Sequence, residues 1–272
     1  MEFKKPLTVA EQVNYLESNK RVTYNTISKE QAKEILYTHN YINVISPFKY
    51  NFARKNDNGY VIKDKNCNHI YDRNIEFVEY YERYKEERSQ YIKLYAALST
   101  FESSFNAIVS NKVICAYQLI DDCSFNTFIS SIQSNIKSLS NESSISKSHM
   151  IDTINNFKDK LLKYNSIYIF MDRLTISELI TIYKSCGTEL SIKIFKELND
   201  RGLSLGYTRK TDFDNVLSKI IQIRNCIMHN NSLTILIRYY SVKEKSLRKD
   251  TDRKSYQSLI RKLLELYANK YN

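Results

Sequence analysis

Hydrophobic side chains recur every three or four residues along most of this chain, which is the spacing of one face of an α-helix. From residue 74 to residue 110 there is no glycine or proline, so the pattern predicts one long core helix. Its apolar stripe consists of Tyr91, Leu94, Tyr95, Leu98, Phe101, Phe105 and Ile108. Similar patterns predict further helices at 149–164, 176–186, 188–199, 212–230 and 253–270.

The N-terminal region carries signals of shorter helices. "TVAE" at 8–11 and "SKEQ" at 28–31 have the spacing of capping boxes, which open helices, and they predict two or three small helices within 8–50. The stretch 51–73 has polar clusters and an Asn-Gly turn signal at 58–59 between aromatic residues. It is expected to be a loop or small hairpin at a domain boundary.

A second interruption lies in the middle of the chain. Residues 123–148 are rich in serine and asparagine, a composition typical of a mobile connection. Within this segment, "FISSIQSNI" could form a helix.

The composition favours an all-α fold. Only 4 glycines and 2 prolines are present among 272 residues, which leaves few residues for the tight turns of a β-sandwich or Rossmann-type sheet. With 42% hydrophobic residues the chain can bury one large core or two modest ones. We predict a helical bundle over 74–240, a small helical module over 1–73 before it, and a basic amphipathic helix over 241–272 after it.

Cofactor and membrane motifs are not found. The five cysteines are an odd number without CxxC spacing, which favours reduced thiols in the cytoplasm. No P-loop, GxSxG or HExxH motif occurs, Cys67-Asn68-His69 lacks further ligands, and no metal or other cofactor is expected. No signal peptide or run of about 18 apolar residues is present, so no membrane partner is expected. We treat His39, His69 and His149 as incidental.

The net charge of +11 suggests a polyanionic partner, although AT-rich codon bias towards lysine is an equally good explanation of the total. The distribution of charge along the chain favours the first explanation, because residues 241–272 hold nine Lys or Arg against four Asp or Glu. This clustering favours a binding surface. The candidate contacts are Arg248, Lys249, Arg253, Lys254, Arg261 and Lys262.

Two charged residues occupy apolar stripes. On the 212–230 helix, Arg224 falls near the middle of the stripe formed by Phe213, Val216, Leu217, Ile220, Ile227 and Met228. On the 74–110 helix, Glu102 lies between Leu98, Phe101 and Phe105. A buried guanidinium costs several kcal/mol unless a carboxylate, a phosphate or a wet interface compensates it. Two interpretations remain open: an ion pair that locks two helices, or a polar pocket at a seam between helices or subunits.

Asn225 and His229 favour the second interpretation. Their spacing of four places them together on the neighbouring face, at the end of the helix. A lone histidine is more often structural than catalytic. A functional cluster is more credible here, because an arginine, an amide and a histidine lie within one six-residue segment of a basic protein.

These residues carry a resemblance to a known family. "RNCIMH", from Arg224 to His229, resembles the R-N-x-x-x-H signature of HEPN-domain ribonucleases. The opening from "KKPLTVAEQ" to "SPFKYNF" resembles abortive-infection Abi proteins of the AbiD/AbiF type. "YERYKEERSQYIKLYAALSTFESSFNAIV" is similar to their first long HEPN helix and "MDRLTISELITIYKSC" to the segment before their motif helix, so most of 4–235 is covered.

The resemblance implies a HEPN-like bundle that cuts RNA without metal, by attack of the ribose 2′-OH on the adjacent phosphate. It implies catalytic roles for Arg224 as phosphate clamp, His229 as proton shuttle, Asn225 as an orienting group and Glu102 as the partner of Arg224. It also implies a homodimer in which two motif helices meet, and a small structured noncoding RNA that restrains the toxin. Two alternatives stay open: an RNA-binding protein without catalysis, and a helical dimer acting through protein contacts alone.

Overall fold

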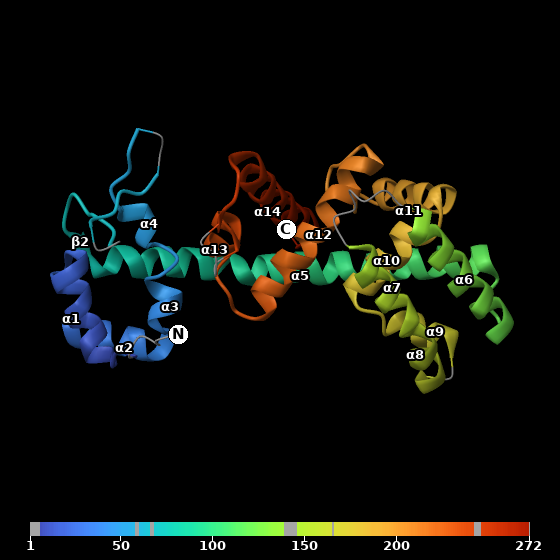
Figure 1. The fold of residues 1–272 in the computed structure, drawn as a ribbon, viewed down its shortest axis with the longest axis horizontal. Helices are drawn as coiled ribbons and strands as arrows, with labels where there is room; N and C mark the ends of the chain where they lie inside the picture. Colours follow the sequence, from blue (N-terminus) through green and yellow to red (C-terminus); the bar gives the residue numbers. More distant parts are fainter. Residues whose placement is uncertain are drawn as a thin grey trace. The chain divides into compact units, whose positions relative to one another are not determined.

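The computed structural model describes residues 6–57, 60–65, 68–138, 146–164, 166–241 and 246–271, and Figure 1 shows its ribbon. The described part is mostly helical, with only short strand pairs, so the predicted all-α class is confirmed. The chain forms two compact units, each assembled from two separate stretches. Unit 1 comprises Met1–Ile92 and His229–Arg248, and unit 2 comprises Lys93–Met228 and Lys249–Asn272. The three-part domain division predicted above stays a prediction.

Unit 1 contains the small helices that the capping boxes predict. They are α1 (Val9–Lys20), α2 (Lys29–His39), α3 (Tyr41–Val44) and α4 (Lys49–Phe52). The Thr8 and Ser28 hydroxyls accept hydrogen bonds from the backbone N–H groups three residues on, and Glu11 and Gln31 complete both boxes. The core beneath these helices includes Val13, Leu16, Leu36, Val44, Phe77 and Tyr80.

Short strands and one further helix complete unit 1. Strand β1 (Val22–Thr23) pairs in parallel with β2 (Ile75–Glu76), and β3 (Tyr239–Ser241) pairs antiparallel with β4 (Ser246–Leu247). Helix α13 (Leu233–Arg238) precedes β3 and was not predicted.

The predicted loop or hairpin between 51 and 73 is confirmed as an irregular antiparallel arrangement. Single bridges join Lys55 to Val61 and Lys63 to His69. Asn58 and Gly59, on which the turn prediction rests, lie outside the described residues, as does Cys67.

Helix α5 (Phe77–Tyr117) is the long helix predicted from the apolar stripe, and it continues beyond the predicted end at 110. Its residues up to Ile92 belong to unit 1 and the remainder to unit 2. The other helices of unit 2 are α6 (Asp122–Ser138), α7 (Lys147–Asn155), α8 (Phe157–Tyr164), α9 (Ile167–Asp172), α10 (Ile176–Ser185), α11 (Thr188–Asp200), α12 (Lys210–Met228) and α14 (Asp250–Tyr271).

Two predictions in unit 2 need correction. The helix that "FISSIQSNI" could form is confirmed as part of α6, but α6 covers most of the segment expected to be a mobile connection, because Phe125, Phe128, Ile132 and Ile136 recur at helical spacing and are buried while serines occupy the outer face. The single helix expected at 149–164 is interrupted at Asn156, which separates α7 from α8. The serine-rich residues 139–145 lie outside the described residues.

Candidate functional site

Helices α5 and α12 of unit 2 place Glu102 and Arg224 side by side. Aromatic packing positions the two helices, because the Phe101 ring lies 6.4 Å from that of Phe213. The predicted stripe on α12 is buried at Phe213, Val216, Leu217, Ile220 and Ile227. Arg224 lies between Ile220 and Ile227 and extends its side chain towards α5.

The structure contains the Glu102–Arg224 ion pair that the first interpretation expects. Arg224 Nε donates to Glu102 Oε1 at 3.1 Å, while the exposed side-chain fractions of Arg224 and Glu102 are 34% and 28%. The pair is therefore half-buried and keeps access to solvent. Arg224 Nη1 also lies 3.4 Å from Asn225 Oδ1. Other guanidinium N–H groups have no protein acceptor within the described chain, and they remain available to an anion.

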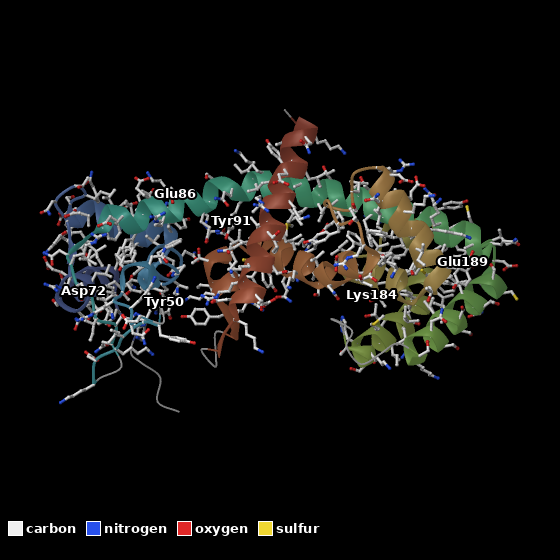
Figure 2. The ribbon with its side chains drawn as sticks, turned by 90° about the horizontal axis from the view of Figure 1, so that it is seen from above. Tyr50, Asp72, Glu86, Tyr91, Lys184 and Glu189 are labelled. Carbon is white, nitrogen blue, oxygen red and sulfur yellow. The ribbon has the colours of Figure 1, made fainter. Side chains whose placement is uncertain are left out.

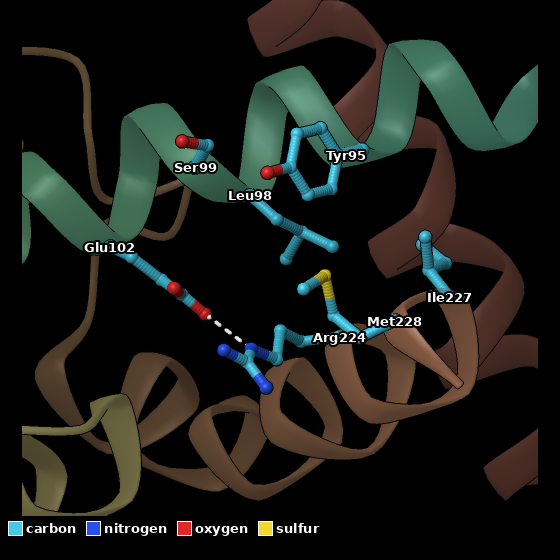
Figure 3. A pocket seen from close by; sticks show the side chains of 7 residues that line it. All are labelled: Tyr95, Leu98, Ser99, Glu102, Arg224, Ile227 and Met228. Carbon is cyan, nitrogen blue, oxygen red and sulfur yellow. Dashed lines mark hydrogen bonds and ion pairs between the residues drawn. The ribbon is translucent and has the colours of Figure 1, made fainter. Parts of the chain in front are cut away.

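A small pocket opens beside this ion pair, as Figure 3 shows. It has a volume of about 90 Å³, and its lining consists of Tyr95, Leu98, Ser99, Glu102, Arg224, Ile227 and Met228. Ligand pockets that enclose a whole drug-sized molecule measure about 300–1,000 Å³. This pocket is too small for a nucleotide and suits a single small group such as a phosphate.

Two apolar side chains at this pocket depart from the sequence prediction. Tyr95 and Met228 were placed in the buried stripes of their helices, but they are 52% and 47% exposed. The apolar residues of the two stripes thus do not bury the charged pair completely, and a partly apolar surface borders the pocket.

Asn225 and His229 are both exposed. Helix α12 ends at Met228, so His229 lies in a turn and not on the helix that was predicted to reach residue 230. Asn230 adopts a left-handed conformation with φ of 54°, which prevents the helix from continuing beyond this turn. The structure brings Glu102, Arg224 and Asn225 together in unit 2, and His229 opens the second stretch of unit 1.

A cluster of hydrogen bonds within unit 1 holds the chain that follows His229. Arg88 donates from Nη1 to Asn230 Oδ1 and from Nη2 to Asn230 O, and its guanidinium lies 4.7 Å from the centre of the Tyr91 ring. The Tyr91 hydroxyl donates to Asn231 O and accepts the Leu233 N–H at 3.1 Å. The turn containing His229 is thereby tied at its C-terminal side to α5.

Glu87 completes this anchor at the start of α13. Its Oε2 accepts from the Thr234 N–H at 2.8 Å, the Thr234 hydroxyl at 2.6 Å and the Ser232 hydroxyl at 3.2 Å. A carboxylate at the N-terminus of a helix also faces the positive end of the helix dipole. This anchor was not predicted, because Glu87 and Arg88 lie in "KEERSQ", which has the composition of an ordinary solvated helix face, and Tyr91 was assigned only to the apolar stripe.

The basic residues predicted as RNA contacts have different environments. Arg248 was expected on a basic surface but is 8% exposed, and its Nε donates to Leu236 O at 2.8 Å. Arg253 pairs with Asp250, and Lys262 donates to Leu205 O. The exposed members of the set are Lys249, Lys254 and Arg261.

The described residues contain no candidate metal site, no candidate membrane-spanning helix and no disulfide. They contain no group of three His, Cys, Asp or Glu side chains that could hold a metal ion. None of their helices combines the length and apolar character needed to cross a membrane. Their cysteines are unpaired: Cys115 and Cys123 are exposed, whereas Cys186 and Cys226 are buried.

Comparison with known proteins gives one match. A family model described as Abi-like protein matches residues 34–234, a range that includes both α5 and α12. Searches of curated proteins and of solved structures return no significant match.

Proposed function

The chain belongs to the Abi-like protein family, a membership that suggests abortive infection, and on this premise we propose that it is a metal-independent endoribonuclease of the HEPN type. One observation carries the proposal. Arg224, the first residue of the R-N-x-x-x-H sequence, is held by Glu102 at an open, phosphate-sized pocket with part of its guanidinium free.

In the proposed reaction a ribose 2′-oxygen attacks the adjacent phosphorus, and the bond from phosphorus to the 5′-oxygen breaks. The proton of the 2′-OH leaves to a base, and the departing 5′-oxygen gains a proton. Histidine is the side chain that most often serves as general acid and base, and the exposed imidazole of His229 can serve in these transfers. Arg224 contributes a planar guanidinium that binds the phosphate and stabilises the charge that develops on it. Glu102 orients Arg224, and Asn225 orients His229 or the phosphate.

A second copy of this chain is the proposed partner at the pocket. Tyr95 and Met228 leave apolar surface exposed beside Arg224, and covering such surface on association is favourable. A dimer that joins two α12 helices there would bring two sets of motif residues together. The exposed cations Lys249, Lys254 and Arg261 support binding of RNA, as substrate and as a small noncoding regulator.

The test is cleavage of a mixed RNA pool by the purified protein in the presence of EDTA. We expect fragments ending in 2′,3′-cyclic phosphate and 5′-OH. His229→Ala should lower the cleavage rate by about 10²–10⁴, the usual contribution of general acid–base catalysis. Arg224→Lys should also reduce cleavage, since it keeps the charge but removes the planar fork.

His149→Ala is the matched control, because His149 is an exposed histidine on α7 and should leave the rate unchanged. Cleavage that survives His229→Ala, or that requires a metal ion, contradicts the proposal. Salt-dependent RNA binding without cleavage would indicate an RNA-binding protein. Absence of both would indicate a dimer that acts through protein contacts.

A further inference from the structure

A second cluster of basic side chains surrounds His69 in unit 1. Burial and the nearby charges of Lys49, Lys20, Lys63 and Arg238 lower the pKa of His69 to about 4. The imidazole is therefore neutral at pH 7, and the four cations give the cluster a strong positive potential. Arg238 comes from α13 and Lys20 and Lys49 from α1 and α4, so the fold gathers these charges from separate segments.

Carboxylates do not neutralise this cluster. No acidic group is among the charges that act on His69. Asp64 accepts from Asn68, and Asp72 pairs with Arg54 at 3.6 Å. Among the described residues, none of the four cations forms an ion pair. Such an excess of like charge is unfavourable unless an anion compensates it.

Aromatic rings hold the cations in place. The Arg238 guanidinium lies 4.1 Å from the centre of the Tyr50 ring, and the Lys49 ammonium lies 5.1 Å from it. The rings of His69 and Tyr239 pack against Tyr50 at 4.9 Å and 5.6 Å. Tyr50 is labelled in Figure 2. Arg238 also hydrogen-bonds Tyr239, but cation–π contacts themselves do not satisfy N–H donors, so the other donors of the cluster stay available.

Two polar atoms in the cluster have no hydrogen-bond partner. His69 Nδ1 and Arg238 Nε are buried and unpaired within the described chain. Buried polar groups in native proteins nearly always have a partner, and an unpaired one calls for a ligand or another explanation. The cluster is also reachable, because Lys49, Tyr50, His69 and Arg238 are half-buried and Lys63 is exposed.

We propose that Lys49, Lys63, His69 and Arg238 form a binding site for a phosphate group carried by a nucleotide, either free or within an RNA strand. The guanidinium and the ammonium groups would make charge-assisted hydrogen bonds to the phosphate oxygens, and His69 would complete the set. Lys20, which is only 9% exposed, adds long-range positive charge. The proposal does not depend on RNA cleavage, because no residue of the cluster belongs to the proposed catalytic set.

The test measures binding of two probes to the full chain. The first is a fluorescent 2′-O-methyl uridine dodecamer, which lacks the free 2′-OH needed for cleavage, and the second is AMP. The variant Lys49→Gln/Arg238→Gln removes two cations from the cluster. The control Lys33→Gln/Lys85→Gln removes two exposed cations of unit 1 that pair with Glu30 and Glu82.

We expect at least a tenfold weaker Kd for the cluster variant, about the factor that one charge-assisted hydrogen bond provides, and little change for the control. If the dodecamer is the ligand, its slope of log K against log salt should also flatten by about 0.7, the value for one lost phosphate contact. The probe that loses affinity in the cluster variant identifies whether the phosphate belongs to an RNA strand or to a free nucleotide. Equal affinities in the two variants, or no binding of either probe, would overturn the proposal.

A second measurement on the unmodified protein covers the case in which the cluster variant fails to fold. The pKa of His69 is followed by NMR with and without each probe. A phosphate bound within the cluster should raise this pKa from about 4 towards the ordinary value near 6.5. A His69 pKa that neither probe shifts would overturn the proposal.

Discussion

Replacing Glu102 by Gln tests whether the ion pair to Arg224 stabilises unit 2. The substitution keeps the shape of the side chain and removes its charge. The gross Coulomb attraction at 3.1 Å is about 5 kcal/mol at an effective dielectric constant of 20, but desolvation offsets most of it. Exposed pairs contribute about 0.2–1 kcal/mol and hydrogen bonds to charged groups about 1.5–3 kcal/mol. With about a third of each side chain exposed, we expect a coupling energy of about 1–1.5 kcal/mol.

The assay is a double-mutant cycle of Glu102→Gln and Arg224→Gln, read from urea unfolding at low and high salt. The Glu197–Arg201 pair is the matched control, because the Arg201 side chain is 63% exposed and the pair should couple by only about 0.3–0.5 kcal/mol. The Glu102–Arg224 coupling should decline only modestly in high salt, since partly buried pairs are less screened. A coupling no larger than the control would refute the argument that Glu102 holds Arg224.

Three further predictions follow from other contacts. Tyr91→Phe should lower the free energy of unfolding by about 1–3 kcal/mol and speed hydrogen exchange at the Leu233 amide, because that buried N–H loses its acceptor; an unchanged exchange rate would contradict the anchor. Burial raises the pKa of Cys186 to about 12, so iodoacetamide at pH 8 should label Cys115 and leave Cys186 unmodified in a mass spectrum. The pKa of His69 is lowered to about 4, so the folded state binds fewer protons than the unfolded state between pH 6.5 and 4. Stability should fall as the pH falls through this window, and urea titrations should show a smaller fall for His69→Gln.

The sequence could predict the fold wherever local pattern decides it. The capping boxes and the unbroken stripe of α5 are such cases, because hydrogen-bond geometry and periodicity act over a few residues. Helix α6 was predicted only in part because its serines suggest a loop by composition, whereas four buried apolar residues decide its structure. Helix α13 has a local cap at Ser232 but only six residues, too few for a periodic pattern, and its further contact to Glu87 joins residues 147 apart in sequence.

The candidate site, too, could be predicted only in part from the sequence. Arg224 and Glu102 could be paired from the sequence, because opposite charges in two apolar stripes need compensation. The exposure of Tyr95 and Met228 could not be predicted, since periodicity assigns a face but does not say where a neighbouring helix stops covering it. The cluster around His69 escaped detection because Lys49, His69 and Arg238 come together only through tertiary contacts.

The stretches of the two compact units alternate along the chain, which determines when each unit can fold during protein synthesis. Neither unit is a single uninterrupted segment, because unit 1 needs His229–Arg248 in addition to Met1–Ile92 and unit 2 needs Lys249–Asn272 in addition to Lys93–Met228. The Glu102–Arg224 contact closes a loop with a sequence separation of 122, so it cannot form until most of the chain has left the ribosome. If the chain is a ribonuclease as proposed, a growing polypeptide is harmless to the ribosome that makes it, and truncated products are harmless to the cell.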